Sequence, residues 1–440
     1  MSNTTTNTNK TNLFSQKVEK ENCSNLFKIN KFMISDAGGA GLNILIDSGL
    51  VDDKENYFLY ATSRNVFDKA DNFLSENIAY TGHAHPSLTK GSGQDLTKGK
   101  QNALACWIKG NFAELSGRMT GNSKISHSFG FGGGGSTLPA IELQNRKLNE
   151  AINQSLDVSD NEEDFDVESF ASSTELLGLM STVVKPRNFE EAKIKNYTAG
   201  INSITYDSDG TYNPKTSYKI IKIDDLDSNS HAGSLSPNEI LQIAILDYHQ
   251  TNLIVTKFFT SESVEDTDID ESEIMLAIND NGEMVINRGE GKSMTTAWNN
   301  FKDEYVKLNS TATIEGALHS LIMFEYPSDY VLTQEDSKER EKIIRAINKQ
   351  TNTNSNSSII KYTVITGNVT QPTINCMFTG ISSEDNRLNT ASKSLKQSLN
   401  IKTEQLKKEA KVINGEITKP PMDNVERARN ASNARWGSKN

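Results

Sequence analysis

Three glycine-rich segments, each placed between an apolar run and a stretch of helical spacing, constrain this chain's fold more than any other feature. They are DAGGAGLN at 36–43, LTKGSG at 88–93 and GFGGGGST at 130–137. Apolar run, glycine turn and helix in that order are typical of a strand–loop–helix unit. Glycine lets the backbone approach a ligand, and a helix N-terminus offers free N–H groups to phosphates. The pattern therefore favours an α/β domain with a phosphate-binding edge.

The rest of the chain extends this pattern into several parts. Apolar runs alternate with helical stretches up to residue 236, which predicts a parallel, doubly wound sheet, and a mixed pattern after residue 259 predicts a second α+β domain. The expected parts are a disordered tail at 1–26, an α/β domain at 27–236 with an acidic insertion at about 157–168, a long central helix at 237–258, a second α+β domain at 259–384, a C-terminal helix at 385–415 and a basic tail at 416–440.

Composition excludes several classes of protein. The formal net charge of −11 argues against general binding of nucleic acid or anionic membranes by the body of the protein, and it suits a protein that meets a polyphosphate together with Mg²⁺. The three cysteines show no CxxC spacing, so we expect a reducing cytoplasm and no zinc site. No apolar run approaches the roughly 20 residues of a membrane span, and the N-terminus lacks a signal-peptide core.

Other nucleotide folds fit less well. The sequence has no GxxxxGK[ST] motif, so a P-loop is not expected. The first glycine segment reads GGAGLN rather than GxGxxG, and the next apolar run ends in Ala61-Thr62-Ser63 instead of an acidic residue. A Rossmann-type nucleotide enzyme therefore stays only as a distant alternative.

The order of these segments resembles the tubulin/FtsZ superfamily. The glycine segments and TSR at 62–64 are similar to that family's first four nucleotide loops, and the resemblance continues in VVKPRNFE at 183–190, IKIDD at 221–225, SPNEIL at 236–241 and DIDESEI at 268–274. It covers roughly residues 28–382 and is closest in character to plasmid and bacteriophage tubulin-like proteins. By this resemblance, the α/β domain is a GTP-binding domain.

The resemblance implies a set of residues that bind GTP or GDP. Asn238 would read the guanine, Glu190 would face the ribose, and Mg²⁺ would be held mainly by phosphates and water, with no side-chain metal ligands. The full set is Gly38, Gly39, Ala40, Asn43, Ser63, Gly91, Ser92, Gly93, Gly132, Gly133, Gly134, Gly135, Ser136, Thr137, Glu190, Lys193, Asp224 and Asn238.

The same resemblance implies catalysis between subunits. Asp270 and Glu273, with Asp268, would hold the attacking water, and the family places this loop at the opposite end of the subunit from its own phosphate loops. Hydrolysis of GTP to GDP and phosphate then requires head-to-tail stacking into a filament. The implied function is a cytoplasmic GTPase filament, in a bacterium or an infected host cell, that positions or segregates phage or plasmid DNA.

Departures from the family pattern keep a second function open. Ser136 and Leu138 stand where the family signature has glycine, Gly135 replaces its threonine, and Glu273 replaces an aspartate. The alternative is a tubulin-like structural filament or nucleotide-binding protein with little or no hydrolysis. Residues 268–273 can also be interpreted as a solvated acidic loop, and Asn238 as a helix-capping or plain surface residue.

Three other features have simpler interpretations. His83 and His85 lack a third ligand and predict a surface loop, and Cys106 has apolar neighbours that predict a core position. The basic tail carries Arg427, Arg429, Arg435, Trp436 and Lys439, and it is either solvated or contacts the acidic surface of a neighbouring protomer or of an adaptor for cargo.

Overall fold

The computed structural model describes residues 29–34, 57–70, 73–120, 124–156, 178–205, 216–228, 234–265, 267–280, 282–308, 314–352 and 358–381. All of them belong to the compact unit Met1–Ser383, and the unit Glu384–Asn440 lies outside the described residues. The N-terminal tail, the first glycine segment with Gly38 to Asn43, the acidic insertion, the C-terminal helix and the basic tail also lie outside them.

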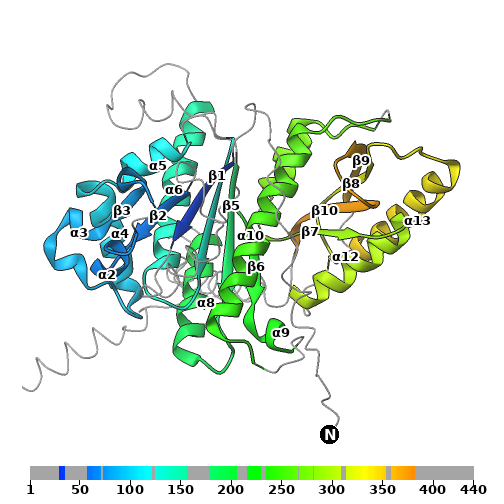
Figure 1. Ribbon diagram of the computed structural model, residues 1–440. Helices are drawn as coiled ribbons and strands as arrows, with labels where there is room; N and C mark the ends of the chain where they lie inside the picture. The colour runs from blue at the N-terminus through cyan, green and yellow to red at the C-terminus, as the bar shows by residue number, and fades with distance from the viewer. Residues whose placement is uncertain are drawn as a thin grey trace, which may run out of the picture. The chain divides into compact units, whose positions relative to one another are not determined.

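One mixed sheet organises the described residues. Its strand order is β3-β2-β1-β4-β5-β6-β7-β10-β8-β9. Figure 1 shows the strands of this sheet together with the helices. The strands are β1 (Ile29–Ile34), β2 (Tyr57–Ala61), β3 (Ile78–Tyr80), β4 (Ile125–Phe131), β5 (Gly178–Lys185), β6 (Thr216–Lys222), β7 (Gly282–Glu290), β8 (His319–Pro327), β9 (Ile359–Gly367) and β10 (Thr373–Ile381). Strands β3 to β7 pair in parallel, β10 pairs antiparallel with β7 and β8, and β9 is parallel to β8. The predicted doubly wound α/β class is confirmed.

Helices cover both faces of the sheet. They are α2 (Arg64–Phe67), α3 (Thr81–Ala84), α4 (Leu96–Lys109), α5 (Phe112–Thr120), α6 (Thr137–Leu156), α8 (Glu191–Thr205), α9 (Ile223–Ser228), α10 (Pro237–Thr260), α11 (Glu271–Ile278), α12 (Met294–Leu308) and α13 (Gln334–Thr351), with short 3₁₀ turns at Ser75–Asn77 and Pro86–Thr89. One core cluster joins α2, α9 and α10 to the parallel strands, and a second joins α4, α5, α6 and α8 to them. Two further clusters pack α11 with the end of α10, and α12 with α13, onto the mixed strands.

Two local features position residues near the glycine loops. The stretch after the second glycine segment forms two helices, α4 and α5, and the N–H of Gly110 bonds to the carbonyl of Cys106 at 3.1 Å where α4 ends. Strand β6 ends at Lys222, so Asp224 lies in the first turn of α9. As predicted, Cys106 is buried, and burial raises the pKa of its thiol to about 12.

The central helix α10 joins two of the core clusters. Ser236 and Glu239 form a capping box at its start, with Pro237 in the first turn, a combination that fixes where a helix begins. Ile240, Ile245 and Tyr248 pack into the core under the parallel strands, whereas Ile254, Val255 and Phe258 pack into the core that also contains α11 and strands of the second half. Twenty-four residues give a helix of roughly 36 Å.

Buried polar pairs hold α10 between these two cores. Lys219 Nζ lies 2.7 Å from Asp247, and Lys257 Nζ lies 2.9 Å from Glu325 on β8. His127 on β4 lies between Asn252 on α10 and Thr182 on β5, at 2.6 Å and 2.9 Å. Such pairs are satisfied in only one alignment of helix and sheet, so they fix the register of α10.

His127 is held neutral in this seam. Burial is the main cause that lowers its pKa from 6.5 to about 3, aided by the charge of Lys219 and opposed by the Asn252 hydrogen bond. A neutral imidazole offers one donor and one acceptor. The amide oxygen of Asn252 can only accept, so Nδ1 carries the proton and Nε2 accepts from the Thr182 hydroxyl.

We expect His127 to make the fold sensitive to mild acid. Because its folded pKa is lowered, its contribution is complete above the unfolded value of 6.5 and is lost as the pH falls towards 3. Between pH 7.5 and 5 this loss is about 2 kcal/mol. Urea unfolding measures the free energy of unfolding at both pH values. From pH 7.5 to pH 5 it should decrease less in His127→Gln than in wild type, by that amount. The exposed control His85→Asn should keep the wild-type fall, and an equal fall in His127→Gln would contradict the assignment.

Candidate nucleotide site and acidic loop

The parallel strands define one edge at which ligand-binding loops can gather. Strands β1 and β4 are neighbours at the point where the strand order reverses, and open α/β sheets bind ligands at the carboxyl ends of strands at such a point. The loop after β4 is the glycine run of 132–135, and α6 begins directly after it at Thr137. The glycine run therefore lies at the position that this fold class uses for ligands.

The second and third glycine segments are bonded to each other. The N–H of Gly135 donates to the carbonyl of Gly93 at 2.7 Å, and the hydroxyls of Ser92 and Ser136 form a buried hydrogen bond. Gly91 and Gly93 have φ of 70° and 60°, the left-handed region that favours glycine. The two loops therefore form one unit.

Some backbone N–H groups of this unit are already hydrogen-bonded within the protein. The N–H of Gly132 donates to the carbonyl of Val184 at 2.9 Å, and that of Gly135 is bonded to Gly93. Gly132 and Gly135 are among the residues that the resemblance implies for GTP binding, but their N–H groups are engaged within the protein. Gly135 also has no room for a side chain, since a Cβ there would lie 2.7 Å from the backbone of Asp95.

Ser63 lies beside the second loop. It forms an isolated antiparallel bridge with Lys90, and its hydroxyl accepts from the N–H of Val66 at 3.4 Å as the N-cap of α2. A Cβ on Gly91 would lie within 4.0 Å of Ser63 Cβ. Ser63 is thus brought to the same edge as the glycine loops, with a capping role of its own.

The loop after β5 continues this edge on the other side of the glycine run. A Cβ on Gly133 would lie 2.9 Å from Lys193 Cβ and 3.2 Å from Pro186, and Lys193 forms an ion pair with Glu190. The N–H of Asn188 donates to Asp224 at 2.9 Å. Lys193 therefore lies next to the glycine run, Glu190 is paired with Lys193, and Asp224 is bonded to the loop after β5.

Arg187 and Asp227, which sequence reasoning missed, complete the edge. Arg187 Nε donates to Asp227 Oδ2 at 2.7 Å, and Arg187 Nη2 donates to the carbonyl of Leu235 at 2.9 Å. Asp227 Oδ1 in turn accepts from the N–H of Leu235 at 2.8 Å. Asn238, exposed in the first turn of α10, follows three residues after Leu235.

The predicted catalytic acids lie at the opposite edge of the sheet. Lys124, which immediately precedes β4, pairs with Glu271 of α11 at 2.5 Å, whereas the glycine run follows the other end of β4. Seven strand residues span about 23 Å. The acidic loop therefore cannot reach the glycine run of its own subunit.

Asp270 and Glu273 also have a local role. They form a capping box at the start of α11, in which the Glu273 N–H donates to Asp270 Oδ1 at 2.9 Å and the Asp270 N–H donates to Glu273 at 3.4 Å. Asp268 accepts from the N–H of Ser263 at 3.2 Å. Asp270 is thus the N-cap of α11 and Glu273 its third residue.

Lys361 on β9 adds a positive charge to this loop. It forms an ion pair with Glu273, which raises its pKa. Hydrogen bonds from Ser272 and the Glu273 amide lower the pKa of Asp270, and the charge of Lys361 adds to this. Asp270 is therefore ionised at neutral pH. No sequence pattern links Lys361 to a loop some ninety residues earlier.

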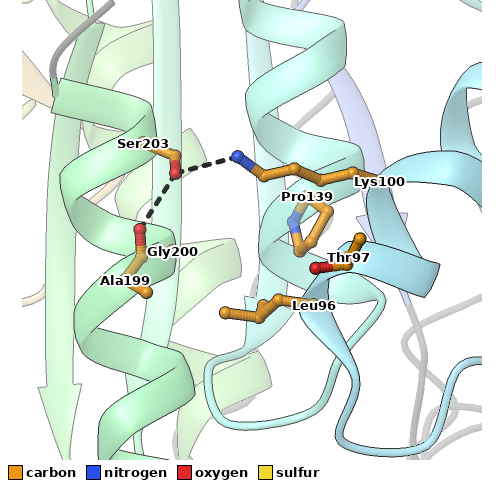
Figure 2. A pocket seen from close by; sticks show the side chains of 7 residues that line it. All are labelled: Leu96, Thr97, Lys100, Pro139, Ala199, Gly200 and Ser203. Atoms are coloured by element: carbon orange, nitrogen blue, oxygen red, sulfur yellow. Dashed lines mark hydrogen bonds between the residues drawn. The ribbon is translucent and has the colours of Figure 1, made fainter. Parts of the chain in front are cut away.

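A small cavity lies beside the glycine loops, between α4, α6 and α8 (Figure 2). It has a volume of about 210 Å³, and Lys100 donates to Ser203 across it at 3.3 Å. Its lining residues are Leu96, Thr97, Lys100, Pro139, Ala199, Gly200 and Ser203. Since ligand pockets for drug-sized molecules begin at about 300 Å³, it is too small for a nucleotide, and it contains no predicted site residue.

Other kinds of site are not seen in the described part of the chain. Within those residues, no group of three or more His, Cys, Asp or Glu side chains could hold a metal ion. None of the helices described is both long and apolar enough to cross a membrane. His83 and His85 are exposed on and just after α3, where His83 packs edge-on against Phe67 and Tyr80.

The fold is similar to that of solved FtsZ, TubZ and CetZ structures. FtsZ from M. jannaschii superposes with a TM-score of 0.53 at 15% identity over 81% of this chain and 89% of that one. TubZ from Bacillus thuringiensis serovar israelensis, in GDP-form protofilaments, gives 0.57 at 12% identity over 90% and 94%. CetZ2 from Haloferax volcanii, a GTPγS-bound protofilament, gives 0.55 at 14% identity over 85% and 100%. No protein-family model and no curated protein sequence matches the chain.

We expect the contact between the glycine loops to tolerate no side chain. Gly135→Ala would push its Cβ into the backbone of Asp95, so it should lower the free energy of unfolding by about 1–3 kcal/mol and loosen the unit. Gly93→Ala is the matched control, because a Cβ there meets no atom within 4 Å and only the positive φ costs about 1 kcal/mol. Denaturant unfolding of both variants checks this. A Gly135→Ala protein no less stable than Gly93→Ala would contradict it.

Proposed function

We propose that this chain is a guanine-nucleotide-dependent filament protein that hydrolyses GTP between head-to-tail subunits. The observation that carries the proposal is the separation of two halves of a site. The glycine loops lie after the carboxyl end of β4, and the carboxylates of α11 lie beside its beginning, about 23 Å away. Stacking one subunit on the next would bring the two halves together.

The glycine edge suits a polyphosphate. The N-terminus of α6 follows the glycine run directly, and helix N-termini favour anions. The hydroxyl of Thr137 is buried without a hydrogen-bond partner among the described residues, and a phosphate oxygen would satisfy it. Glu190, Asp224 and Asn238 would face the ribose and guanine, while Mg²⁺, held mainly by phosphates and water, would neutralise phosphate charge.

The acidic loop would supply the water-positioning groups. Asp270 and Glu273 are held at a fixed spacing by their capping box, and their carboxylates would orient a water molecule for in-line attack on the γ-phosphate of the neighbouring subunit. TubZ and CetZ2 are described in protofilaments, which supports head-to-tail assembly of a chain with this fold. The cargo that we propose is plasmid or phage DNA, which the filament would move through an adaptor bound to the basic tail.

A filament with little or no hydrolysis is the second candidate. Two amides of the glycine run are engaged within the protein, and Lys361 already pairs with Glu273. Both features reduce what the site can offer to a transition state.

Assembly and turnover should depend on GTP together. Light scattering and phosphate release are followed in parallel after GTP and Mg²⁺ are added to the full-length protein, with GDP and nucleotide-free samples as controls. We expect scattering to rise only above a critical protein concentration, and phosphate release per subunit to rise with it, since a shared site exists only between subunits. Assembly without phosphate release would favour the second candidate, and a protein that ignores guanine nucleotides would rule out both.

Substitutions that keep the helix cap should separate the two roles of the acids. Asn caps as well as Asp, and Gln serves in a capping box as well as Glu, so Asp270→Asn and Glu273→Gln should leave stability within about 0.5 kcal/mol of wild type. Loss of the carboxylate should lower the turnover rate at least about 100-fold and leave long-lived filaments. Phosphate release and sedimentation are the measurements, and turnover at the wild-type rate would remove these residues from catalysis.

Mixing two inactive proteins tests whether the site is shared. One partner is Asp270→Asn, and the other is Gly134→Asp, in which a carboxylate would repel phosphate from an otherwise normal acidic loop. In an equal mixture, about one contact in four would join an intact glycine run to an intact acidic loop, so about a quarter of wild-type turnover should return. No recovery, with both proteins found in the same filaments, would contradict a site built from two subunits.

A further inference from the structure

Three separate segments meet at one arginine. Arg187 lies in the loop between β5 and α8, Asp227 lies in α9, and Leu235 immediately precedes the capping residue of α10. Arg187 Nε and Nη2 donate to the two carboxylate oxygens of Asp227 at 2.7 Å and 3.4 Å, and Nη2 also donates to the Leu235 carbonyl at 2.9 Å. Asp227 closes the ring by accepting from the Leu235 N–H at 2.8 Å.

This ring, which we name the Arg187–Asp227 clasp, is sheltered and ionised. The side chains of Arg187 and Asp227 are each 17% exposed. Burial tends to raise the pKa of Asp227, but hydrogen bonds from Arg187 and the Leu235 amide, together with the charge of Arg187, hold it below its ordinary value. The hydrogen bond to Asp227 likewise raises the pKa of Arg187. Fork-shaped, charge-assisted bonding of this kind fixes distance and angle, which a lysine cannot reproduce.

Each part of the clasp carries a residue proposed to contact nucleotide. On the loop, the Arg187 N–H bonds to Glu190 at 3.2 Å, and the next N–H, of Asn188, bonds to Asp224 in α9 at 2.9 Å. On the helix side, Leu235 is followed by the first turn of α10 with Asn238. The positions of Glu190, Asp224 and Asn238 relative to one another therefore depend on the same few bonds.

The clasp requires the guanidinium of Arg187. An apolar side chain at this position could pack against its neighbours but could not bond to a carboxylate and a carbonyl together. Resting on the proposed function, we infer that Arg187 and Asp227 are positioning residues that set the spacing of the ribose- and guanine-facing groups, and so determine affinity for guanine nucleotide rather than the rate of hydrolysis.

The test compares four full-length variants with wild type. Arg187→Met and Asp227→Asn each remove the Arg187–Asp227 interaction, and their double variant removes the same single interaction. Arg187→Lys keeps the positive charge but lacks the forked guanidinium. The control is Arg345→Met, which removes an exposed i,i+4 pair with Glu341 on α13. Binding of fluorescently labelled GDP is measured with Mg²⁺ below the assembly concentration, and KM and kcat for GTP are measured above it.

We expect both single variants to weaken GDP binding about tenfold and to raise KM similarly, with kcat at saturating GTP within about twofold of wild type. The double variant should be no weaker than the weaker single variant, because both remove one interaction. Arg187→Lys should recover only part of the affinity, and Arg345→Met should match wild type. Losses that add in the double variant, or that fall on kcat alone, would overturn the positioning role.

Amide hydrogen exchange without nucleotide gives an independent measure. The first turn of α10 should exchange faster in Arg187→Met than in wild type, because its entry is no longer tied to the β5–α8 loop. If wild type and Arg187→Met bind GDP equally well, the positioning role of the clasp is overturned and the proposed function is not. Wild type that binds no guanine nucleotide would overturn the proposed function, and the positioning role with it.

Discussion

The common direction of the parallel strands is the constraint on which the rest of this structure depends. From β3 to β7 every pair is parallel, so the loop after each strand lies at one edge of the sheet and the loop before it lies at the other. The glycine loops, the β5–α8 loop and α9 all follow strands, and contacts from Ser63 to Leu235 join them into one continuous rim. The acidic loop packs beside residues that precede strands, and this separation makes the molecule polar along the strand direction.

The central helix connects the two edges. Its start is fixed to the nucleotide edge through Asp227 and Leu235, and its end leads into the acidic loop. Inside the core, Lys219 and His127 on the sheet bond to α10, and Lys257 on α10 bonds to the sheet. An unpaired charge there would cost several kcal/mol. A shift of α10 along its axis would break these pairs together. The helix therefore holds a single register, and the positions of the glycine edge and the acidic loop are linked through it.

Much of this arrangement could be predicted from the sequence, because glycine turns, apolar runs and a capping sequence are local signals. The strands, the start of α10 and the glycine edge all follow from them. Contacts between segments could not be predicted. Nothing near Gly135 indicates that its N–H is bonded to Gly93, and nothing near Glu273 indicates Lys361. Arg187 could not be singled out from the sequence, since its partners lie 40 and 48 residues further along the chain.

In the acidic loop, one local sequence pattern has two interpretations, a helix start and a pair of functional acids. Asp-x-x-Glu before an apolar stretch is a helix-start signal, and the structure uses it as one. A cap needs only an acceptor, however, and Ser or Thr at the first position with Gln at the last would serve as well. Two carboxylates in one capping box, one of them paired with Lys361, exceed what the cap requires. These carboxylates lie at the opposite end of the strands from the glycine loops. Under the proposed function, positioning a water molecule between subunits would use the acidic groups that the cap does not need.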